Sequence, residues 1–478
     1  MEITLWEHQK QCIEKAKDLD YFALFLEMGT GKSITTIQIL REKYKKHGKL
    51  LPTLIFCPPV VIQNWKKEFL RASKIKSENI IPLVGTGKER LALFKASPQN
   101  SIFITNFETL QMPEVFEYMK VVLKNTPSCL VVDESQRVKD ITAKRTKRMI
   151  ELGDIASYRY ILTGTPILND LMDIYSQFRV LDRGQAFGHN FFSFRARYFE
   201  DKNKAMPASK YFPRWEPIRG ADRRIKELIE PVSMYVQKTQ CLSLPPLVRK
   251  TIEVPMGKEQ QRLYDSMKKD LIATVTGSDG VDRHSIAELA ITKALRLMQI
   301  ISGHVKVEGI NGEEDKTIHI KDNPRKDALY QLLEDIAPYE KCIVWAVYKS
   351  NYEDIRDVCN RLKIKYVEIN GEVKDKDEQA NLFRTGPEVR VLIGNPMSGG
   401  IGLNLVEASC MIYYSRTFSL EADLQSEARC WRGGSEIHQK ITRIDLVTPA
   451  SLDELVVKCL ASKQELSDKV LKQSIEEI

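Results

Sequence analysis

Two short segments, about one hundred residues apart, carry residue types that handle nucleotide phosphates. The first is a glycine-containing loop after the apolar run Phe22–Leu26, and it consists of Met28, Gly29, Thr30, Gly31, Lys32 and Ser33. The backbone N–H groups of such a loop point towards phosphate oxygens, and the N-terminus of a following helix adds a favourable dipole. Lys32 is expected to reach the β- and γ-phosphates and Ser33 to ligate Mg²⁺. This segment therefore predicts a site for nucleotide phosphates with Mg²⁺.

The second segment ends the apolar run Leu130–Val132 with two carboxylates, Asp133 and Glu134. Asp133 is expected to hold Mg²⁺, usually through water, and Glu134 to orient the water that attacks the γ-phosphate. The glycine loop fits only the later half of the usual phosphate-loop pattern, because Leu26 stands where that pattern has glycine. The two segments together predict hydrolysis of a nucleoside triphosphate more strongly than the loop does alone.

Length and charge set the frame for this chemistry. The 478 residues are enough for two or three domains, and 43% hydrophobic with 28% charged residues is typical of a globular protein. An excess of 72 Lys and Arg over 64 Asp and Glu gives a net charge of +8. A mildly basic chain is compatible with a nucleic-acid partner but does not require one.

The basic residues are concentrated between Phe191 and Lys226, where ten Lys and Arg stand against four Asp and Glu among many aromatic residues. Basic groups beside aromatic rings are typical of surfaces that follow a phosphate backbone. The same composition also fits a solvated helical region with a small core of its own. The sequence leaves both interpretations open.

The cysteines and apolar runs indicate the compartment. Nine cysteines include no Cys-x-x-Cys pair, and several lie in apolar runs, which is typical of small buried side chains in a reducing compartment. No apolar run has the length of a membrane span, and the N-terminus has no signal-peptide pattern. We therefore predict a cytoplasmic protein without membrane contact, in the bacterial host cytoplasm if the chain is phage-encoded.

Short apolar runs alternate with helical patterns in two separate blocks. The predicted strands of the first block are Tyr21–Leu26, Thr53–Cys57, Ser101–Thr105, Cys129–Val132 and Tyr160–Leu162. Those of the second block are Cys342–Ala346, Tyr366–Ile369, Val389–Ile393, Met411–Tyr414 and Ile441–Leu446. Continuous apolar strands separated by helices indicate parallel sheets that are covered on both faces. The fold class predicted is therefore α/β, with two parallel sheets.

Helical patterns dominate the sequence between and after these blocks. The stretch from Leu168 to Gln240 is helical and aromatic, and 258–301 is a further helical stretch. The polar segment Val307–Asp322 predicts a loop or small hairpin, and the charged end, Ser451–Ile478, predicts a helix.

From Leu5 to Leu446 an ordered series of motifs resembles the superfamily 2 helicases and, within them, the Snf2-like ATPases. Leu5–Gln9 is similar to the element that contacts adenine, which implies that role for Gln9. Leu54–Phe69 and Ile104–Leu110 are similar to segments that meet the nucleic-acid backbone. The resemblance implies nucleic-acid contacts from Pro58, Gln63 and Asn106, whereas we expect Trp65 and Phe69 to lie in the core.

The carboxylate segment and the motif after it follow the same family pattern with one change. Gln136 stands where relatives usually have a histidine that communicates with the next motif, similar here to Leu162–Asn169. The resemblance implies that Gln136 lies at the nucleotide. It also implies that Thr163 contacts the nucleic acid and that the threonine hydroxyls relay the state of Glu134.

The second block contains the remaining motifs. Ile393–Leu405 resembles an element that contacts nucleic acid, and the residues implied are Asn395, Gly399 and Gly400 for the nucleic acid and Gly402 for the nucleotide. Gln425–Ser435 resembles the arginine-finger motif, although Ser435 replaces the usual glutamine. Arg429 and Arg432 are three residues apart and would share one face of a helix. The resemblance implies that both act on the γ-phosphate, where an arginine finger contributes about 10³–10⁵ in rate.

The resemblance implies two RecA-like lobes and a helical Snf2-type insertion. We predict the first lobe at 1–167, the insertion and inter-lobe region at 168–300, and the second lobe with a C-terminal helix at 301–478. The implied enzyme is a DNA-dependent ATPase, expected to be monomeric and of the small type found in phages and bacteria. It would move on duplex or branched DNA, remodel that DNA or displace bound proteins.

Three alternatives stay open at this stage. An RNA-directed helicase of the same superfamily would be stimulated more by RNA than by DNA. A phosphate-loop enzyme acting on small molecules, such as a kinase, would not need the glycine-rich run and the paired arginines in this order. A DNA-binding scaffold with a decayed ATP site is disfavoured because Lys32, Asp133, Glu134 and both arginines are present.

Overall fold

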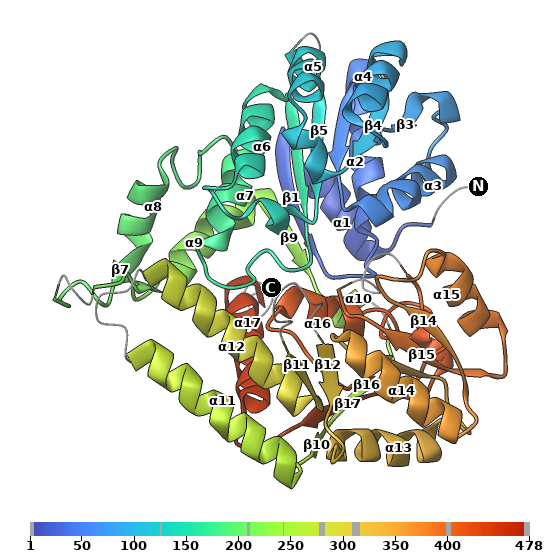
Figure 1. Cartoon of the computed structure of the whole chain (residues 1–478). Coiled ribbons are helices and arrows are strands. Elements are labelled where there is room, and N and C mark those ends of the chain that lie inside the picture. The colour runs from blue at the N-terminus through green and yellow to red at the C-terminus, as the bar shows by residue number, and fades with distance from the viewer. Residues whose placement is uncertain are drawn as a thin grey trace. The chain divides into compact units, whose positions relative to one another are not determined.

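The computed structural model describes residues 4–124, 127–207, 211–241, 243–276, 283–307, 316–397 and 403–472 (Figure 1). Its contacts divide the chain into two compact units, Met1–Ser243 with Lys463–Ile478 and Leu244–Ser462. The predicted middle region, 168–300, therefore contributes to both units. Each unit is described by itself below.

A parallel sheet of seven strands forms the centre of the first unit, in the order β3-β4-β2-β5-β6-β1-β9. Its strands are β1 (Tyr21–Leu26), β2 (Thr53–Phe56), β3 (Ile80–Pro82), β4 (Ile102–Thr105), β5 (Cys129–Asp133), β6 (Tyr158–Leu162) and β9 (Ser233–Val236). The five strands predicted for the first block are confirmed. The short strands β3 and β9 were not predicted, because neither forms an extended apolar run.

Helices cover both faces of this sheet, as the apolar strands require. Successive strand residues enter opposite cores: Leu54 packs with helices α4 to α7, and its neighbour Ile55 packs with helices α1 to α3. The helices are α1 (Glu7–Ala16), α2 (Lys32–His47), α3 (Ile62–Ala72), α4 (Gly87–Ala96), α5 (Pro113–Lys124), α6 (Lys144–Ile155) and α7 (Asp173–Leu181). Because all strands run in the same direction, their carboxyl ends lie at one edge, where ligands of such sheets bind.

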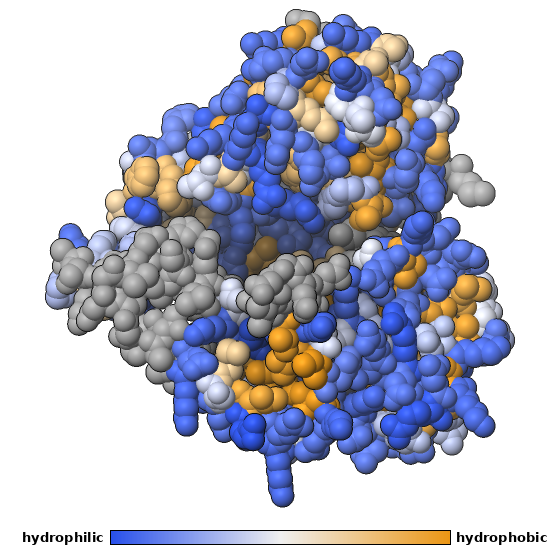
Figure 2. All heavy atoms as spheres, viewed as in Figure 1, coloured by the Kyte–Doolittle hydropathy of each residue, from blue (hydrophilic) through white to orange (hydrophobic). Residues whose placement is uncertain are grey.

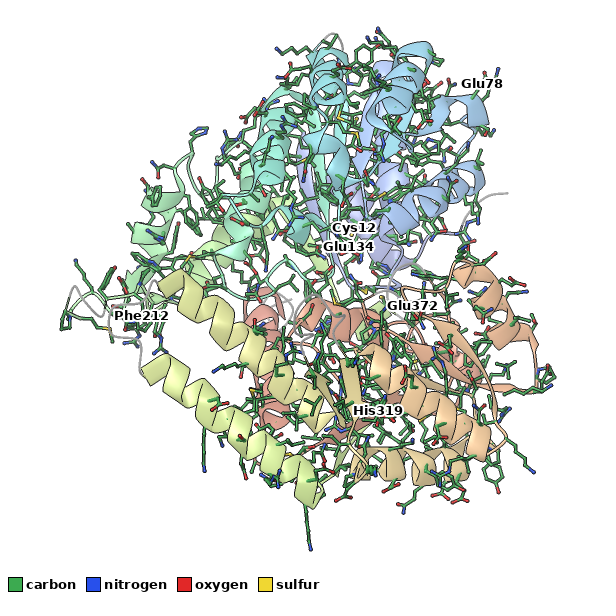
Figure 3. The ribbon with its side chains drawn as sticks, viewed as in Figure 1. Cys12, Glu78, Glu134, Phe212, His319 and Glu372 are labelled. Carbon is green, nitrogen blue, oxygen red and sulfur yellow. The ribbon has the colours of Figure 1, made fainter. Side chains whose placement is uncertain are left out.

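The basic and aromatic region extends from the first unit as short elements. They are α8 (Phe191–Tyr198), β7 (Phe199–Asp201), β8 (Trp215–Pro217), α9 (Ala221–Ile229) and α10 (Lys238–Cys241). Phe194 and Tyr198 are buried in the core of the unit, whereas Phe192 is 67% exposed and Phe212 is 54% exposed. Figure 2 shows pale orange atoms gathered over α8, and Figure 3 labels Phe212 on the extension made by β7 and β8. The region thus has both a core and an exposed aromatic surface.

A second parallel sheet of six strands forms the centre of the second unit, in the order β10-β17-β16-β13-β15-β14. Its strands are β10 (Leu247–Glu253), β13 (Cys342–Trp345), β14 (Lys365–Ile369), β15 (Val389–Gly394), β16 (Cys410–Tyr413) and β17 (Ile441–Val447). The five predicted strands are again confirmed. The edge strand β10 was missed because it is polar and largely exposed.

Helices cover both faces of the second sheet as well. Val344 packs with α13 (Pro324–Ile336) and α14 (Lys349–Arg361), while its neighbour Ile343 packs with α15 (Lys376–Thr385). The other elements of this part of the chain are α11 (Lys258–Thr276), α12 (Arg283–Ile301), β11 (His304–Val307), β12 (Lys316–His319), α16 (Leu420–Glu427) and α17 (Leu452–Lys472).

The segment Val307–Asp322, predicted to be a loop or small hairpin, contains β12, which pairs antiparallel with β11, the strand that ends at Val307. The predicted helices at 258–301 and near the C-terminus are present as α11, α12 and α17. Within the described residues, none of the helices combines the length and the apolar character that crossing a bilayer demands.

Candidate functional site

The predicted phosphate loop lies between β1 and α2 at the carboxyl edge of the first sheet. Gly29 and Gly31 have φ angles of 85° and 83°, a left-handed conformation that residues with a Cβ rarely adopt. A Cβ at Gly31 would also lie 2.1 Å from Nε2 of Gln9. The backbone conformation therefore favours glycine at position 31, and a Cβ there would also displace the side-chain amide of Gln9.

Lys32 and Ser33 are the first two residues of α2. The first turn of this helix contains no acidic residue, so its own side chains do not neutralise the positive end of the helix dipole. Nζ of Lys32 donates a hydrogen bond to the carbonyl oxygen of Leu26 at 3.0 Å. This turn therefore combines free N–H groups with an ammonium group, which suits a phosphate anion.

The element predicted to contact adenine is attached to the phosphate loop through Thr30. Nε2 of His8 lies 2.9 Å from the carbonyl oxygen of Thr30, and Nε2 of Gln9 lies 3.4 Å from it. Oε1 of Gln9 accepts a hydrogen bond from the backbone N–H of Trp6 at 2.9 Å. Gln9 is 3% exposed, so its contact with adenine remains a prediction. The position of Gln9 nevertheless connects the N-terminal helix to the phosphate loop.

Asp133 and Glu134 lie at the carboxyl end of β5 (Figure 3). Oδ1 of Asp133 accepts a hydrogen bond from the backbone N–H of Glu134 at 3.0 Å, and Oδ2 accepts one from Nε1 of Trp65 at 2.9 Å. Glu134 has a φ of 55°, which costs a residue with a Cβ about 1–3 kcal/mol and is typical of functional sites. The chain thus holds this carboxylate pair in a defined and strained geometry.

The Asp133 carboxylate lacks full charge compensation. Burial, followed by the negative charge of Glu134, raises the pKa of Asp133 to about 6, and the Lys32 ammonium opposes this only in part. A divalent cation would supply the missing positive charge, and a hydroxyl group with a carboxylate is a ligand set that Mg²⁺ accepts. The residues predicted as metal ligands, Ser33 and Asp133, therefore fit Mg²⁺ in their chemistry.

Gln136 contacts the second carboxylate directly. Its Nε2 donates a hydrogen bond to Oε2 of Glu134 at 2.7 Å. Gln136 therefore orients the Glu134 carboxylate where relatives usually have a histidine. Thr163 is fully buried, and its hydroxyl oxygen accepts a hydrogen bond from the N–H of Thr165 at 2.9 Å. Direct contact of Thr163 with nucleic acid stays a prediction. The burial of Thr163 agrees better with the predicted role of its hydroxyl in relaying the state of Glu134.

The two predicted finger arginines lie beyond α16, so the expectation that they share one face of a helix is wrong. The helix ends at Glu427, and the carbonyl oxygen of Arg429 accepts a hydrogen bond from the N–H of Leu405 at 3.0 Å. Their side chains nevertheless converge on one group. Nη1 of Arg429 and Nη1 of Arg432 lie 3.1 Å and 3.5 Å from the carbonyl oxygen of Leu403.

A buried network of charged side chains anchors the helix that precedes these arginines. Arg443 on β17 donates to Asp423 at 2.8 Å and to Glu427 at 2.7 Å, both on α16. Arg416 forms ion pairs with Asp423 and Asp445. Burial acts to raise the pKa of Asp423, but the Arg443 and Arg416 guanidinium groups outweigh it and the pKa is lowered. The arginine pair therefore follows directly after a rigid, charge-balanced segment.

Two family models match the chain in this order. The SNF2-related domain matches residues 21–303, and the helicase conserved C-terminal domain matches residues 324–434. The chain belongs to the SNF2-related family. The two parallel sheets are the two RecA-like lobes that were predicted. The first match covers the phosphate loop and the carboxylates, and the second covers both arginines.

Relatives of this SNF2-related chain differ in length. An uncharacterized ATP-dependent helicase of Mycoplasma genitalium is 26% identical over 94% of this chain and 40% of its own length. The putative protein p41 of Acyrthosiphon pisum secondary endosymbiont phage 1 is 25% identical over 97% of both chains. The DNA repair and recombination protein RDH54 of Saccharomyces cerevisiae is 25% identical over 97% of this chain and 52% of its own length. The chain thus spans about half or less of two of these relatives.

The predicted nucleic-acid contacts of this family member occupy different environments. In the first unit Gln63 is exposed at the start of α3, Pro58 is buried, and Asn106 is half-buried and accepts a hydrogen bond from Arg90 at 2.8 Å. In the second unit Asn395 follows β15 and donates to the hydroxyl of Tyr352 at 3.0 Å. The predicted residues Gly399, Gly400 and Gly402 lie outside the described residues. These contacts all remain predictions.

Sequence reasoning missed two features of the site. Trp65 was expected to be a core residue, and it is buried, but its indole N–H also binds Asp133. No sequence signal distinguishes such an indole from an ordinary core tryptophan. The charged network did leave a signal, because Arg443 and Asp445 occupy alternate positions of an otherwise apolar strand. Charged residues on one face of a buried strand indicate buried ion pairs.

Proposed function

We propose that this SNF2-related enzyme hydrolyses ATP when it binds DNA and uses the cycle to move on duplex or branched DNA. Such movement would remodel the DNA or displace bound proteins. The observation that carries the proposal is the carboxylate pair, buried Asp133 and half-buried Glu134, fixed at the same sheet edge as the phosphate loop. An ATP-binding scaffold would not need the second carboxylate in a strained conformation.

In the proposed reaction the first unit binds the nucleotide and prepares the water. The N-terminus of α2 and Lys32 bind the phosphates, while Ser33 and Asp133 would hold Mg²⁺, which would neutralise charge on the phosphate oxygens. Glu134, oriented by Gln136, positions the attacking water and accepts its proton. Gln9 contacts adenine from the helix that is attached to Thr30.

The second unit would supply Arg429 and Arg432 to the γ-phosphate. Their guanidinium groups stabilise the charge that spreads over the phosphate oxygens during transfer. Because the catalytic groups belong to two units, turnover requires both units to engage one nucleotide. Nucleic acid bound by both units would favour that arrangement, so DNA is proposed to stimulate hydrolysis.

Several observations support DNA as the partner. One relative is named as a DNA repair and recombination protein, and the exposed aromatic residues Phe192 and Phe212 lie in a basic part of the chain. The phage relative, which matches over nearly its whole length, supports a location in the bacterial host cytoplasm. We propose that the enzyme acts there as a monomer.

The test compares ATPase rates with no nucleic acid, single-stranded DNA, duplex DNA, a branched junction and RNA under identical conditions. Stimulation by duplex or junction DNA is expected. Greater stimulation by RNA would instead favour an RNA-directed helicase. Equal rates in all five reactions would contradict a nucleic-acid-dependent motor.

A further inference from the structure

The indole of Trp65 connects helix α3 with the carboxylate that is proposed to hold Mg²⁺. Trp65 is 2% exposed and Asp133 is 8% exposed, so their hydrogen bond of 2.9 Å is shielded from water. A hydrogen bond to an ionised, buried acceptor is about twice as strong as one between neutral groups. The contact therefore restrains the orientation of the carboxylate.

Burial alone does not explain this contact. Trp345 is fully buried and its Nε1 has no hydrogen-bond partner among the described residues, while Nε1 of Trp431 donates to the carbonyl oxygen of Pro245 at 2.9 Å. A buried indole of this chain is thus tolerated without a described acceptor, and a half-buried one is satisfied by backbone. Trp65 differs from both, because its indole N–H binds a side-chain carboxylate, that of Asp133.

Both oxygens of the carboxylate have a fixed donor. The N–H of Glu134 binds Oδ1 and the indole N–H binds Oδ2, so rotation of the group would break one bond or both. Each carboxylate oxygen can accept a second hydrogen bond or contact a metal ligand. Asp133 can therefore serve a cation or its water while Trp65 holds it.

Helix α3 presents two different faces. Ile62, Trp65 and Phe69 point into the core beneath the first sheet, and the rings of the last two lie 6.0 Å apart. Gln63 and Asn64 are exposed on the same turn of the helix. A helical turn is rigid, so a displacement at the exposed residues moves Trp65 as well.

We propose that Trp65 is a positioning residue that orients Asp133 for Mg²⁺ and reports the state of the exposed turn of α3 to it. This inference rests on the proposed function, because it takes Asp133 as the Mg²⁺ carboxylate and Gln63 as a nucleic-acid contact. Loss of the indole N–H would leave ATP contacts of the phosphate loop intact. It would weaken the dependence of nucleotide binding on Mg²⁺.

The test is Trp65→Phe, which removes the N–H and keeps an aromatic ring. Binding of the fluorescent nucleotide mant-ATP is measured with EDTA and then during a Mg²⁺ titration. We expect unchanged binding in EDTA and about a tenfold higher Mg²⁺ concentration at half-saturation, since partners of metal-bound carboxylates contribute 10- to 100-fold. Half-saturation within twofold of the wild-type value would overturn the proposal.

A matched control separates orientation from packing. Phe69→Leu changes a buried aromatic residue of the same helix that makes no polar contact with Asp133 in the described structure. It is expected to lower the unfolding temperature while leaving the Mg²⁺ titration unchanged. An equal Mg²⁺ shift in this variant would mean that packing of α3 alone is responsible, which also overturns the proposal.

A second measurement uses the wild-type chain, in case Trp65→Phe does not fold. The indole ¹H–¹⁵N resonance of Trp65 is followed by NMR while Mg²⁺ and a non-hydrolysable ATP analogue are added. A shift that requires Mg²⁺, and that duplex DNA changes further, is expected. No response to Mg²⁺ would contradict the positioning role. Failure of DNA to stimulate the wild-type ATPase would contradict the proposed function separately, because the Mg²⁺ titration contains no DNA.

Discussion

The surroundings of two aspartates, buried Asp133 and half-buried Asp423, shift the pKa values of these side chains in opposite directions. Asp133, in the first unit, has a second carboxylate as its neighbour, and burial raises its pKa to about 6. Asp423, in the second unit, is held by the guanidinium groups of Arg443 and Arg416, which outweigh burial and lower its pKa. One site lacks positive charge, and the other has its charges balanced.

This difference in charge compensation indicates which of the two regions is suited to bind a ligand. A buried charge that is fully paired within the chain serves rigidity, because removing a partner leaves an uncompensated charge. A buried charge that the chain leaves partly unpaired costs stability and awaits a partner from outside. The first unit thus contains the carboxylate that is proposed to bind a cation, and the second contains an ion-paired helix that the two arginines follow.

The largest effect is expected from Arg432→Ala, which tests whether the arginines beyond the charged network serve catalysis. Its kcat should fall by about 10³–10⁵, because an arginine finger acts on transition-state charge. ATPase assays with duplex DNA and mant-ATP binding measure this, with exposed Lys440→Ala as a control. A large loss of folding stability with unchanged kcat would place Arg432 within the structural network instead.

Glu134→Gln tests the catalytic character of the carboxylate pair. The substitution keeps the size of the side chain and removes the group that accepts the proton, so kcat should fall by about 10²–10⁴ while ATP binding persists. Retained turnover in this variant would show that the attacking water is positioned by another residue.

Asp423→Asn tests the balanced network of the second unit. Loss of this carboxylate leaves Arg443 and Arg416 short of a partner in a buried environment, which should lower the free energy of unfolding by about 3–5 kcal/mol. This free energy of unfolding is measured by urea titration with circular dichroism as the signal. A variant as stable as wild type would remove the contrast between the two aspartates.

Asp133→Asn should raise the free energy of unfolding, opposite in sign to the effect of Asp423→Asn and smaller in size. The folded pKa, about 6, lies above the ordinary value of 3.8, so the folded chain binds more protons between pH 4 and 6. Stability without Mg²⁺ therefore falls as pH rises through this window, and the full penalty is present at pH 7. The asparagine variant should be more stable at pH 7 by about 1–3 kcal/mol and lose that part of the pH dependence.

The check is urea unfolding of wild type and Asp133→Asn from pH 4 to 8 in EDTA. Identical pH profiles for the two chains would contradict the prediction. Addition of Mg²⁺ with a non-hydrolysable ATP analogue should stabilise wild type more than the variant, because only the wild type has the carboxylate that binds the cation.

The sequence predicted most of the fold because its strands are short apolar runs that only a doubly covered parallel sheet can bury. All ten predicted strands are present, and the phosphate loop and carboxylates lie at the ends of the expected elements. It missed β10, which pairs along its whole length with β17 although its own residues are mainly polar. Backbone hydrogen bonding, which any sequence can supply, decides such edge strands.

Local residue types therefore determined the two sheets, the glycine turn at Gly31 and the carboxylates after β5. Only the tertiary structure decided that Trp65 binds Asp133 across 68 residues of sequence, and that Arg429 and Arg432 lie beyond a helix. The physical reason is that an apolar pattern is set by residues that are close together in the sequence, so it can be read before the chain folds. Hydrogen bonds and ion pairs depend on which distant groups meet after the strands assemble.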